Sequence, residues 1–280
     1  MMSHVDHYEE IRYAVDGAVA TVSLNRPAAR NGYTMRMADE LADAFGRADL
    51  DDGVRVVVFT GEGPDFCVGA DLSGGSLGAP TPDADWDEPA GRCSMRIFAM
   101  NKPVIAAIRG AAVGAGSTII LPADFRLAAA DARFGFVFSR RGFYPEGAST
   151  WFLPRLVGLG RSLDWMISGR VFGAEEALAA GLVGELHPAD EVLPRAYELA
   201  AELARRTAPV PVAVIRHLLF RMSPLDSPFP VQRLDSRLIA GLAQSPDAVE
   251  GVLSFLQKRD PVWTETVSRN LPDYLPWNAT

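Results

Sequence analysis

Two short, almost wholly apolar runs constrain the fold of this chain more than any other feature. They extend from Val54 to Phe59 and from Val104 to Ile108. Strands of this kind have both faces buried, as in parallel sheets. Amphipathic helical patterns precede both runs, at Met37 to Ala48 and at Arg92 to Met100. Helices alternating with buried strands predict an α/β domain with crossover helices.

The N-terminal part adds a hairpin and a helix start. Asp16-Gly17 separates apolar-rich runs at Ile11 to Val15 and Ala18 to Leu24, which is a strong signal for a two-residue β-hairpin turn. Thr34 is a candidate N-cap for the first helix. A short helix is expected before a further strand at Phe125 to Ala129.

Strand signals end near Pro188, and helical periodicities follow. We therefore divide the chain into a core, residues 1–195, and a helical C-terminal region, residues 196–280. Ser73 to Pro89 is rich in Gly, Pro, Ser and Asp and predicts a mobile surface loop. The expected C-terminal helices cover Leu193 to Arg205, Pro211 to Phe220, Val231 to Ala243 and Ala248 to Gln257.

Charge and composition exclude several classes of function. The net charge of −8 provides no basic field for nucleic acid or for an anionic membrane surface. No apolar stretch reaches the roughly 18 residues of a membrane span, and the N-terminus lacks a secretory pattern. Two cysteines, Cys67 and Cys93, are too few for a disulfide framework. The low cysteine count favours a cytoplasmic protein. His4 and His7 lie in an N-terminal tail, so we expect no metal site.

Two glycine-rich turns are the candidate sites of chemistry. Gly61 to Leu72 follows the first buried strand, and Arg109 to Ser117 follows the second. Glycines between a strand and a helix let backbone N–H groups point outward together, which suits a developing oxyanion. Such turns are also common for close packing alone. Neither turn has the spacing of a phosphate loop or of a dinucleotide-binding motif.

Further short motifs occur in a fixed order along the chain. They are Leu24-Asn25-Arg26-Pro27, Phe66-x-x-Gly69-x-Asp71-Leu72, Asn101-Lys102-Pro103, Gly110-x-x-x-Gly114-x-Gly116, Asp124-x-Arg126, Phe134-Gly135, Leu153 to Gly158, Gly169-Arg170 and Ala177 to Val183. Taken together, these motifs resemble those of the enoyl-CoA hydratase/isomerase (crotonase) superfamily. This resemblance implies a spiral of ββα turns with a helical C-terminal trimerisation region, and a homotrimer or a dimer of trimers. It also implies an acyl-CoA thioester substrate, CoA being part of the substrate, with no separate cofactor.

The resemblance also suggests site residues. Two backbone N–H groups would hold the thioester oxygen as it becomes an enolate, and here we assign them to Val68 and Ala115. Substrate-contacting positions around them are Cys67, Gly69, Asp71 and Gly114, although Asp71 is better explained as fixing the turn and Cys67 as a small buried thiol. Phe255 and Lys258 resemble positions of the family's last helix, which helps to cover bound CoA.

The acid/base positions depart from the family pattern. Where hydratases of the family carry two glutamates, this chain has Thr118 and Phe138, and neither exchanges a proton near neutral pH. Glu146 aligns with the position of a catalytic Asp in the family's dienoyl-CoA isomerases. We expect a pocket lined by Phe138, Phe143 and Tyr144 to raise the pKa of Glu146, whereas Arg140 and Arg141, if close, would lower it.

One carboxylate and an oxyanion hole suffice for a 1,3-proton shift, so we favour isomerisation of an enoyl-CoA double bond and leave hydration through Glu146 open. Two alternatives remain. One is hydrolysis of a carbon–carbon bond in a cyclic dione or a β-keto thioester. The other is a catalytically silent acyl-CoA-binding protein, because both usual glutamates are absent.

Overall fold

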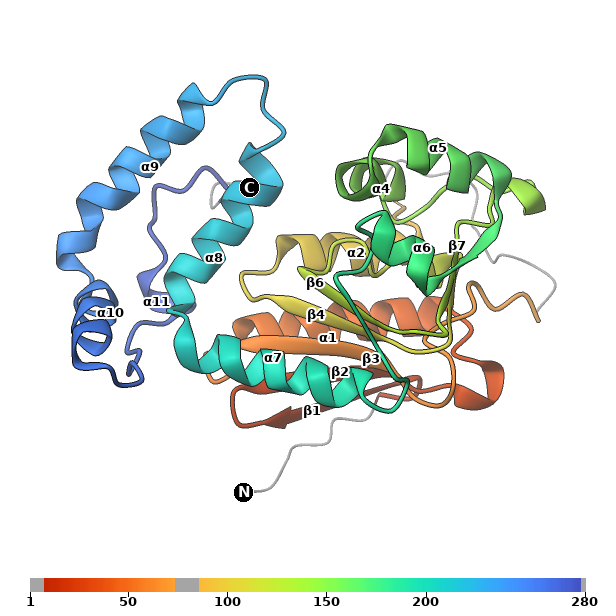
Figure 1. Cartoon of the computed structure of the whole chain (residues 1–280), viewed down its shortest axis with the longest axis horizontal. Coiled ribbons are helices and arrows are strands. Elements are labelled where there is room, and N and C mark those ends of the chain that lie inside the picture. Colours follow the sequence, from red (N-terminus) through yellow and green to blue (C-terminus); the bar gives the residue numbers. More distant parts are fainter. Residues whose placement is uncertain (1–7, 74–85, 278–280) are drawn as a thin grey trace.

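The structure is a computed structural model and describes residues 8–73 and 86–277. A six-stranded sheet with the strand order β1-β2-β3-β4-β6-β9 forms its centre (Figure 1). β1 and β2 pair antiparallel as the predicted hairpin, and the remaining neighbours are parallel. The strands are β1 (Ile11–Asp16), β2 (Val19–Leu24), β3 (Val56–Gly61), β4 (Val104–Ile108), β6 (Phe125–Ala129) and β9 (Glu185–His187).

A second, smaller sheet has the order β5-β7-β8. Its strands, β5 (Ala111–Val113), β7 (Arg133–Gly135) and β8 (Val171–Gly173), have three residues each. The sequence analysis did not predict them, because runs this short have no readable periodicity. β5 leads into the short helix α3 (Ala115–Thr118), so this sheet fixes where that helix begins.

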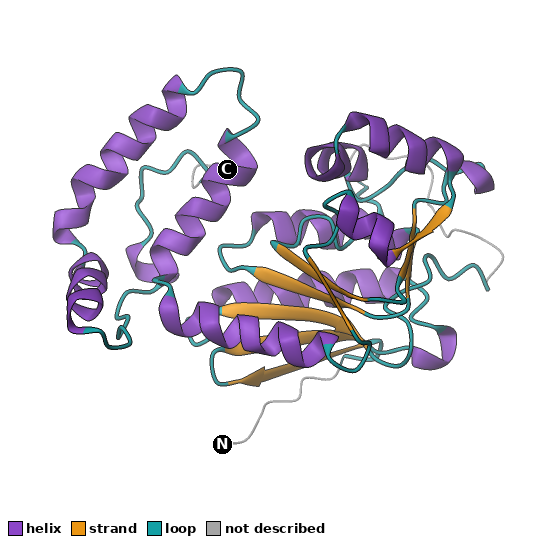
Figure 2. Ribbon diagram, viewed as in Figure 1, coloured by secondary structure: helices purple, strands orange, loops and turns teal. Residues whose placement is uncertain are grey.

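Helices cover both faces of the large sheet, which explains why every residue of β3 is buried. α1 (Met35–Leu50) and α2 (Pro89–Ala99) pack together on one face, and α7 (Val192–Arg206) contacts β2, β3 and β4 on the other (Figure 2). The Thr34 hydroxyl caps α1, as predicted, by accepting a hydrogen bond from the Met37 N–H at 3.0 Å.

Three more helices lie over the small sheet: α4 (Ser149–Val157), α5 (Leu159–Ser168) and α6 (Ala174–Ala179). The C-terminal region is helical, as predicted, and extends away from the large sheet (Figure 1). The boundary that we placed at residue 195 falls inside α7, and the helices that leave the sheet begin with α8. They are α8 (Pro209–His217), continued by a π-helical turn (Leu218–Met222), then α9 (Phe229–Gly241), α10 (Pro246–Gln257) and α11 (Val267–Asn270). Most of the predicted mobile loop, residues 74–85, lies outside the described residues.

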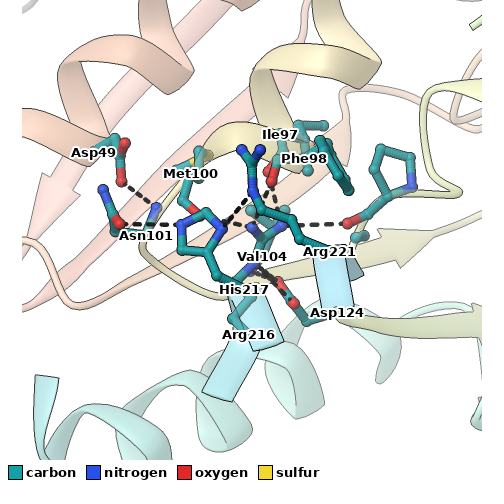
Figure 3. A network of polar contacts seen from close by, with 12 residues as sticks. Asp49, Ile97, Phe98, Met100, Asn101, Val104, Asp124, Arg216, His217 and Arg221 are labelled. Carbon is teal, nitrogen blue, oxygen red and sulfur yellow. Dashed lines mark hydrogen bonds and ion pairs between the residues drawn. The ribbon is translucent and has the colours of Figure 1, made fainter. Parts of the chain in front are cut away.

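A buried arginine on α8 joins the C-terminal region to the core (Figure 3). Arg216 is 5% exposed and donates hydrogen bonds to the carbonyl oxygens of Ile97 at 2.7 Å, Phe98 at 3.0 Å and Met100 at 2.6 Å. Its Nε lies 2.9 Å from a carboxylate oxygen of Asp124. The last carbonyl oxygens of a helix have no donor within the helix, so a buried helix end requires donors from elsewhere. The Arg216 guanidinium supplies them at the end of α2.

His217 reinforces the same junction. Its Nδ1 accepts a hydrogen bond from the Arg221 Nε at 3.1 Å, and its Nε2 lies 3.1 Å from the Asn101 Oδ1. Burial, followed by the charges of Arg216 and Arg221, lowers the pKa of His217 to about 3. The ring is therefore neutral at physiological pH, and its Nε2–H donates to Asn101.

Replacing Arg216 should loosen this junction. Arg216→Met removes the cationic partner of the Asp124 carboxylate and the donor to the carbonyl oxygens at the end of α2, so we expect a loss of about 3–5 kcal/mol in the free energy of unfolding. Guanidinium-induced unfolding measures it. The control is Arg205→Met, because the Arg205–Asp260 ion pair is half-exposed and should contribute less than about 1 kcal/mol. Equal losses in the two variants would contradict the role of Arg216.

Candidate active site

The two glycine-rich turns run side by side and form the floor of the candidate site. Cys67 and Ala112 form a parallel β-bridge, and the Val113 N–H donates to the Cys67 carbonyl oxygen at 2.9 Å. Two residues further along, Gly69 lies against Val113 and Gly114, directly before Ala115, the first residue of α3. The structure thus brings the two predicted turns together.

The two turns approach closely because glycines occupy the point of contact. Gly69 has φ +101°, and a Cβ there would lie 3.0 Å from the Val113 carbonyl oxygen. Gly114 has φ +57°, and a Cβ there would lie 3.5 Å from the Gly69 Cα. A side chain at position 69 would push the turns apart and strain the backbone.

The backbone donors of the first turn differ from the prediction. The Val68 N–H points to the Arg30 carbonyl oxygen, at 3.3 Å, and away from the second turn. Tyr33 forms a β-bridge with Ala70: the Tyr33 N–H donates to the Gly69 carbonyl oxygen at 2.8 Å, and the Asp71 N–H donates to the Tyr33 carbonyl oxygen at 2.9 Å. The Ala70 N–H therefore faces away from Tyr33. In the described part of the chain, neither the Ala70 nor the Ala115 N–H has a hydrogen-bond acceptor. The geometry therefore favours Ala70 over Val68 as partner of Ala115.

Asp71 and Cys67 have supporting roles, as the sequence analysis favoured. Asp71 accepts hydrogen bonds from Arg26 at 2.9 Å and from the Ser73 N–H at 3.0 Å. The Ser73 and Arg26 hydrogen bonds lower the pKa of Asp71 to about 2, so it stays charged and fixes the turn. Burial raises the pKa of the Cys67 thiol to about 12, which leaves it protonated and unreactive.

Glu146 lies in the segment between β7 and α4 and is partly buried. The pKa of Glu146 is raised to about 7, mainly by burial and secondly by the charge of Glu88. Arg140, which could have had the opposite effect, donates instead to the Ser168 carbonyl oxygen at 2.7 Å. Glu146 is therefore a carboxyl group that titrates near neutral pH, as a general acid/base requires.

Contacts of Gly147 place this segment over α3. A Cβ on Gly147 would lie 3.0 Å from the Ser94 Oγ and 3.1 Å from the Thr118 Cβ. Thr118 is fully buried, and its hydroxyl donates to the Ala115 carbonyl oxygen at 3.0 Å. The segment that carries Glu146 thus packs against the position where the family's hydratases have a glutamate.

The predicted aromatic lining is only partly present. Phe138 is 7% exposed and Phe143 is half-buried, and both contact the hydrophobic core. Tyr144 is 91% exposed, so its predicted place in the lining is wrong. The backbone turns it outward on the exposed stretch between Phe143 and Glu146.

Phe255 and Lys258 are not part of this site within one chain. Phe255 is 80% exposed on α10, and Lys258 is the C-cap of the same helix. α10 and α4 lie far apart, at the outer end of the C-terminal region and over the small sheet respectively (Figure 1). Residues of α10 therefore cannot cover a ligand bound beside Glu146 of their own chain.

The sequence analysis missed Glu88, which lies directly before α2. Its Oε1 accepts a hydrogen bond from the Gly147 N–H at 2.6 Å. Glu88 ends a segment rich in Gly, Pro and Asp, where acidic residues are usually solvated, and the residue that it contacts is 59 positions away. No local signal marks such a contact.

Other kinds of site were also considered. Among residues 8–73 and 86–277, no group of three or more His, Cys, Asp or Glu side chains is placed to hold a metal ion. Within the same residues, no helix combines the length and apolar character needed to cross a membrane.

The close packing around Gly147 can be tested by substitution. Gly147→Ala should destabilise the protein by about 1–3 kcal/mol more than Gly142→Ala, because overpacking adds to the backbone strain. Both glycines have positive φ, but a Cβ at Gly142 would meet no atom within 4 Å. Gly142→Ala therefore measures the strain alone. Thermal or denaturant unfolding compares them, and equal effects would show that Gly147 is not tightly packed.

Comparisons with known proteins identify the family of this chain. A model of the family "Enoyl-CoA hydratase/isomerase" matches residues 14–266. An enoyl-CoA hydratase of Alternaria alternata is 40% identical over 260 residues, which are 90% of this chain and 86% of that protein. A 1,2-epoxyphenylacetyl-CoA isomerase of Escherichia coli is 33% identical, with 89% and 96% coverage. The crystal structure of a probable enoyl-CoA hydratase/isomerase from Mycobacterium abscessus superposes with a TM-score of 0.85 at 33% identity, covering 92% of this chain and 99% of that one. The chain therefore belongs to the enoyl-CoA hydratase/isomerase family and has the crotonase fold.

Proposed function

We propose that this enzyme shifts the double bond of an enoyl-CoA, with Glu146 as the group that moves the proton. The observation that carries the proposal is the pKa of Glu146, which is raised to about 7 in a segment packed against α3. Thr118 and Phe138 offer no second proton-transfer group at the positions of the usual glutamates. A shift within one molecule needs only one base that also returns the proton.

The chemistry follows from the two backbone donors and the carboxyl group. The Glu146 carboxylate removes a proton from the carbon next to the double bond, and the electron pair moves onto the thioester oxygen. The N–H groups of Ala70 and Ala115 hold that oxygen, each contributing about 3–4 kcal/mol if they resemble other oxyanion donors. Glu146 then returns the proton to a different carbon. The proton balance closes without a redox or metal cofactor.

Substrate and assembly are part of the same proposal. The similar proteins are named as enzymes that act on CoA thioesters, which supports an acyl-CoA substrate here. Phe255 and Lys258 could reach such a ligand only from another copy of the chain, which supports the proposed homotrimer or dimer of trimers. A cytoplasmic location remains our expectation.

Hydration is the second candidate function, because a relative 40% identical to this chain is named an enoyl-CoA hydratase and one 36% identical is named a probable enoyl-CoA hydratase. It would require Glu146 to activate a water molecule and to protonate the enolate. The product distinguishes it from isomerisation, since only hydration adds the mass of one water.

Exchange in heavy water tests Glu146 directly. We expect the wild-type protein to shift the double bond of 2-enoyl- or 3-enoyl-CoA and to incorporate deuterium, as measured by mass spectrometry. Glu146→Gln should lose at least about 100-fold in rate, because general acid/base groups typically contribute 10²–10⁴-fold. Glu175→Gln, at an exposed position on α6, is the matched control and should behave like wild type.

Other outcomes of this experiment select the alternatives. Equal rates in wild type and Glu146→Gln would refute the role of Glu146. A product with one added water and a broken carbon–carbon bond would indicate a hydrolase. Saturable CoA binding with no deuterium exchange would indicate a silent acyl-CoA-binding protein.

The pH profile gives an independent prediction. Glu146 must be deprotonated to remove the first proton, and its folded-state pKa of about 7 lies above the ordinary value. We therefore expect kcat/KM to rise tenfold per pH unit below about pH 7 and to level off above it. Initial rates over a range of buffers provide the measurement. A midpoint near the ordinary glutamate pKa of about 4.3 would contradict the assignment.

A further inference from the structure

A second carboxyl group, Glu88, holds the segment that carries Glu146. The Glu88 Oε1 accepts the Gly147 N–H at 2.6 Å, so the hydrogen bond engages the peptide group that directly follows Glu146. The Glu88 Oε2 is buried and has no hydrogen-bond partner in the described part of the chain. Carboxylate oxygens without partners are costly to bury, so this placement calls for an explanation.

The surface of α2 is shaped to accept the Glu88 carboxyl group. A Cβ on Gly91 would lie 2.5 Å from the Glu88 Oε1, so glycine at this position leaves the space that the carboxyl occupies. One turn further along α2, Ser94 is fully buried, and its Oγ has no hydrogen-bond partner among the described residues. Gly147 packs against this Oγ. The carboxyl group is thus enclosed between α2 and the Glu146 segment.

We propose that Glu88 is a positioning residue for Glu146, holding its peptide segment in place and setting a second carboxyl group beside the catalytic one. This inference rests on the proposed function of Glu146. In this role Glu88 forms no bond to the substrate, and the proton moves only between the substrate carbons and Glu146.

The electrostatic consequence follows from the groups that face Glu146. Among the residues that the structure describes, Tyr33 and Cys67 interact electrostatically with Glu146 in addition to Glu88. Burial raises the pKa of Tyr33 well above its ordinary value and that of Cys67 to about 12, so both are uncharged when Glu146 titrates. The charge of Glu88 acts on Glu146 together with burial and raises its pKa. A carboxyl group tuned in this way can return a proton as well as take one.

Glu88→Gln separates the hydrogen bond of Glu88 from its charge, because the amide oxygen can still accept the Gly147 N–H while the negative charge is removed. The full-length protein is labelled with ¹³C at the glutamate carboxyl carbons and titrated by NMR. The Glu146 signal is identified by its absence from Glu146→Gln. We expect its midpoint to move to lower pH in Glu88→Gln than in wild type, and the acid limb of kcat/KM to move with it.

Two further variants provide the controls. Glu88→Asp keeps the negative charge, so the Glu146 midpoint should return toward the wild-type value. Asp87→Asn removes a charge from the neighbouring exposed side chain and should leave the midpoint unchanged. If the role of Glu88 were merely structural, its substitution would change neither the midpoint of the Glu146 titration nor the pH at which kcat/KM falls on the acid side.

The result that overturns the proposal is a Glu146 midpoint that is the same in Glu88→Gln and in wild type. This readout does not depend on turnover. If wild type converts no thioester but the midpoint moves, the proposed function fails while the positioning role of Glu88 stands. If wild type is active and the midpoint is unchanged, only the role of Glu88 fails.

Discussion

The parallel pairing of the two glycine-rich turns is the interaction on which the site depends. The Cys67–Ala112 bridge sets the register, and Gly69 permits the contact by leaving no side chain between the backbones. The contact of Gly69 with Gly114 then brings the first turn to the start of α3 at Ala115. The second sheet, α2 and the Glu146 segment all pack around that short helix, so a slip at the bridge would displace every group of the site.

The sequence predicts the scaffold well because its signals are local. A few neighbouring residues suffice to predict each of these elements: the hairpin at Asp16-Gly17, the Thr34 cap and the buried strands β3 and β4. The choice between Val68 and Ala70 was not readable in this way. It depends on which side of the chain each N–H faces, and the positive φ of Gly69 breaks the regular alternation of a strand. Glu88 escaped prediction because its contact joins residues distant in sequence, and Tyr144 because exposure is decided by tertiary packing.

The acid/base group that we propose has a different position from the glutamates of the family's hydratases. Thr118 is fully buried beneath the segment that carries Glu146, and its hydroxyl is engaged with the backbone of α3. The space above α3 is taken by Gly147, whose hypothetical Cβ would already be too close to Thr118 and Ser94. Restoring a glutamate at position 118 would therefore require the whole segment to move, together with the Glu88 hydrogen bond that holds it.

The use of main-chain donors has a consequence for how such a protein can change its chemistry. In the proposed function, backbone N–H groups of two turns stabilise the oxyanion. This stabilisation does not depend on the side chains at Ala70 and Ala115, provided that these side chains fit. Proton transfer resides in a side chain on a separate segment. The two tasks thus belong to different kinds of group, but both groups are positioned through α3: Gly147 packs against Thr118, and the Thr118 hydroxyl bonds to the Ala115 carbonyl oxygen. A change in the segment that carries Glu146 would therefore also reach the turn that holds the Ala115 N–H.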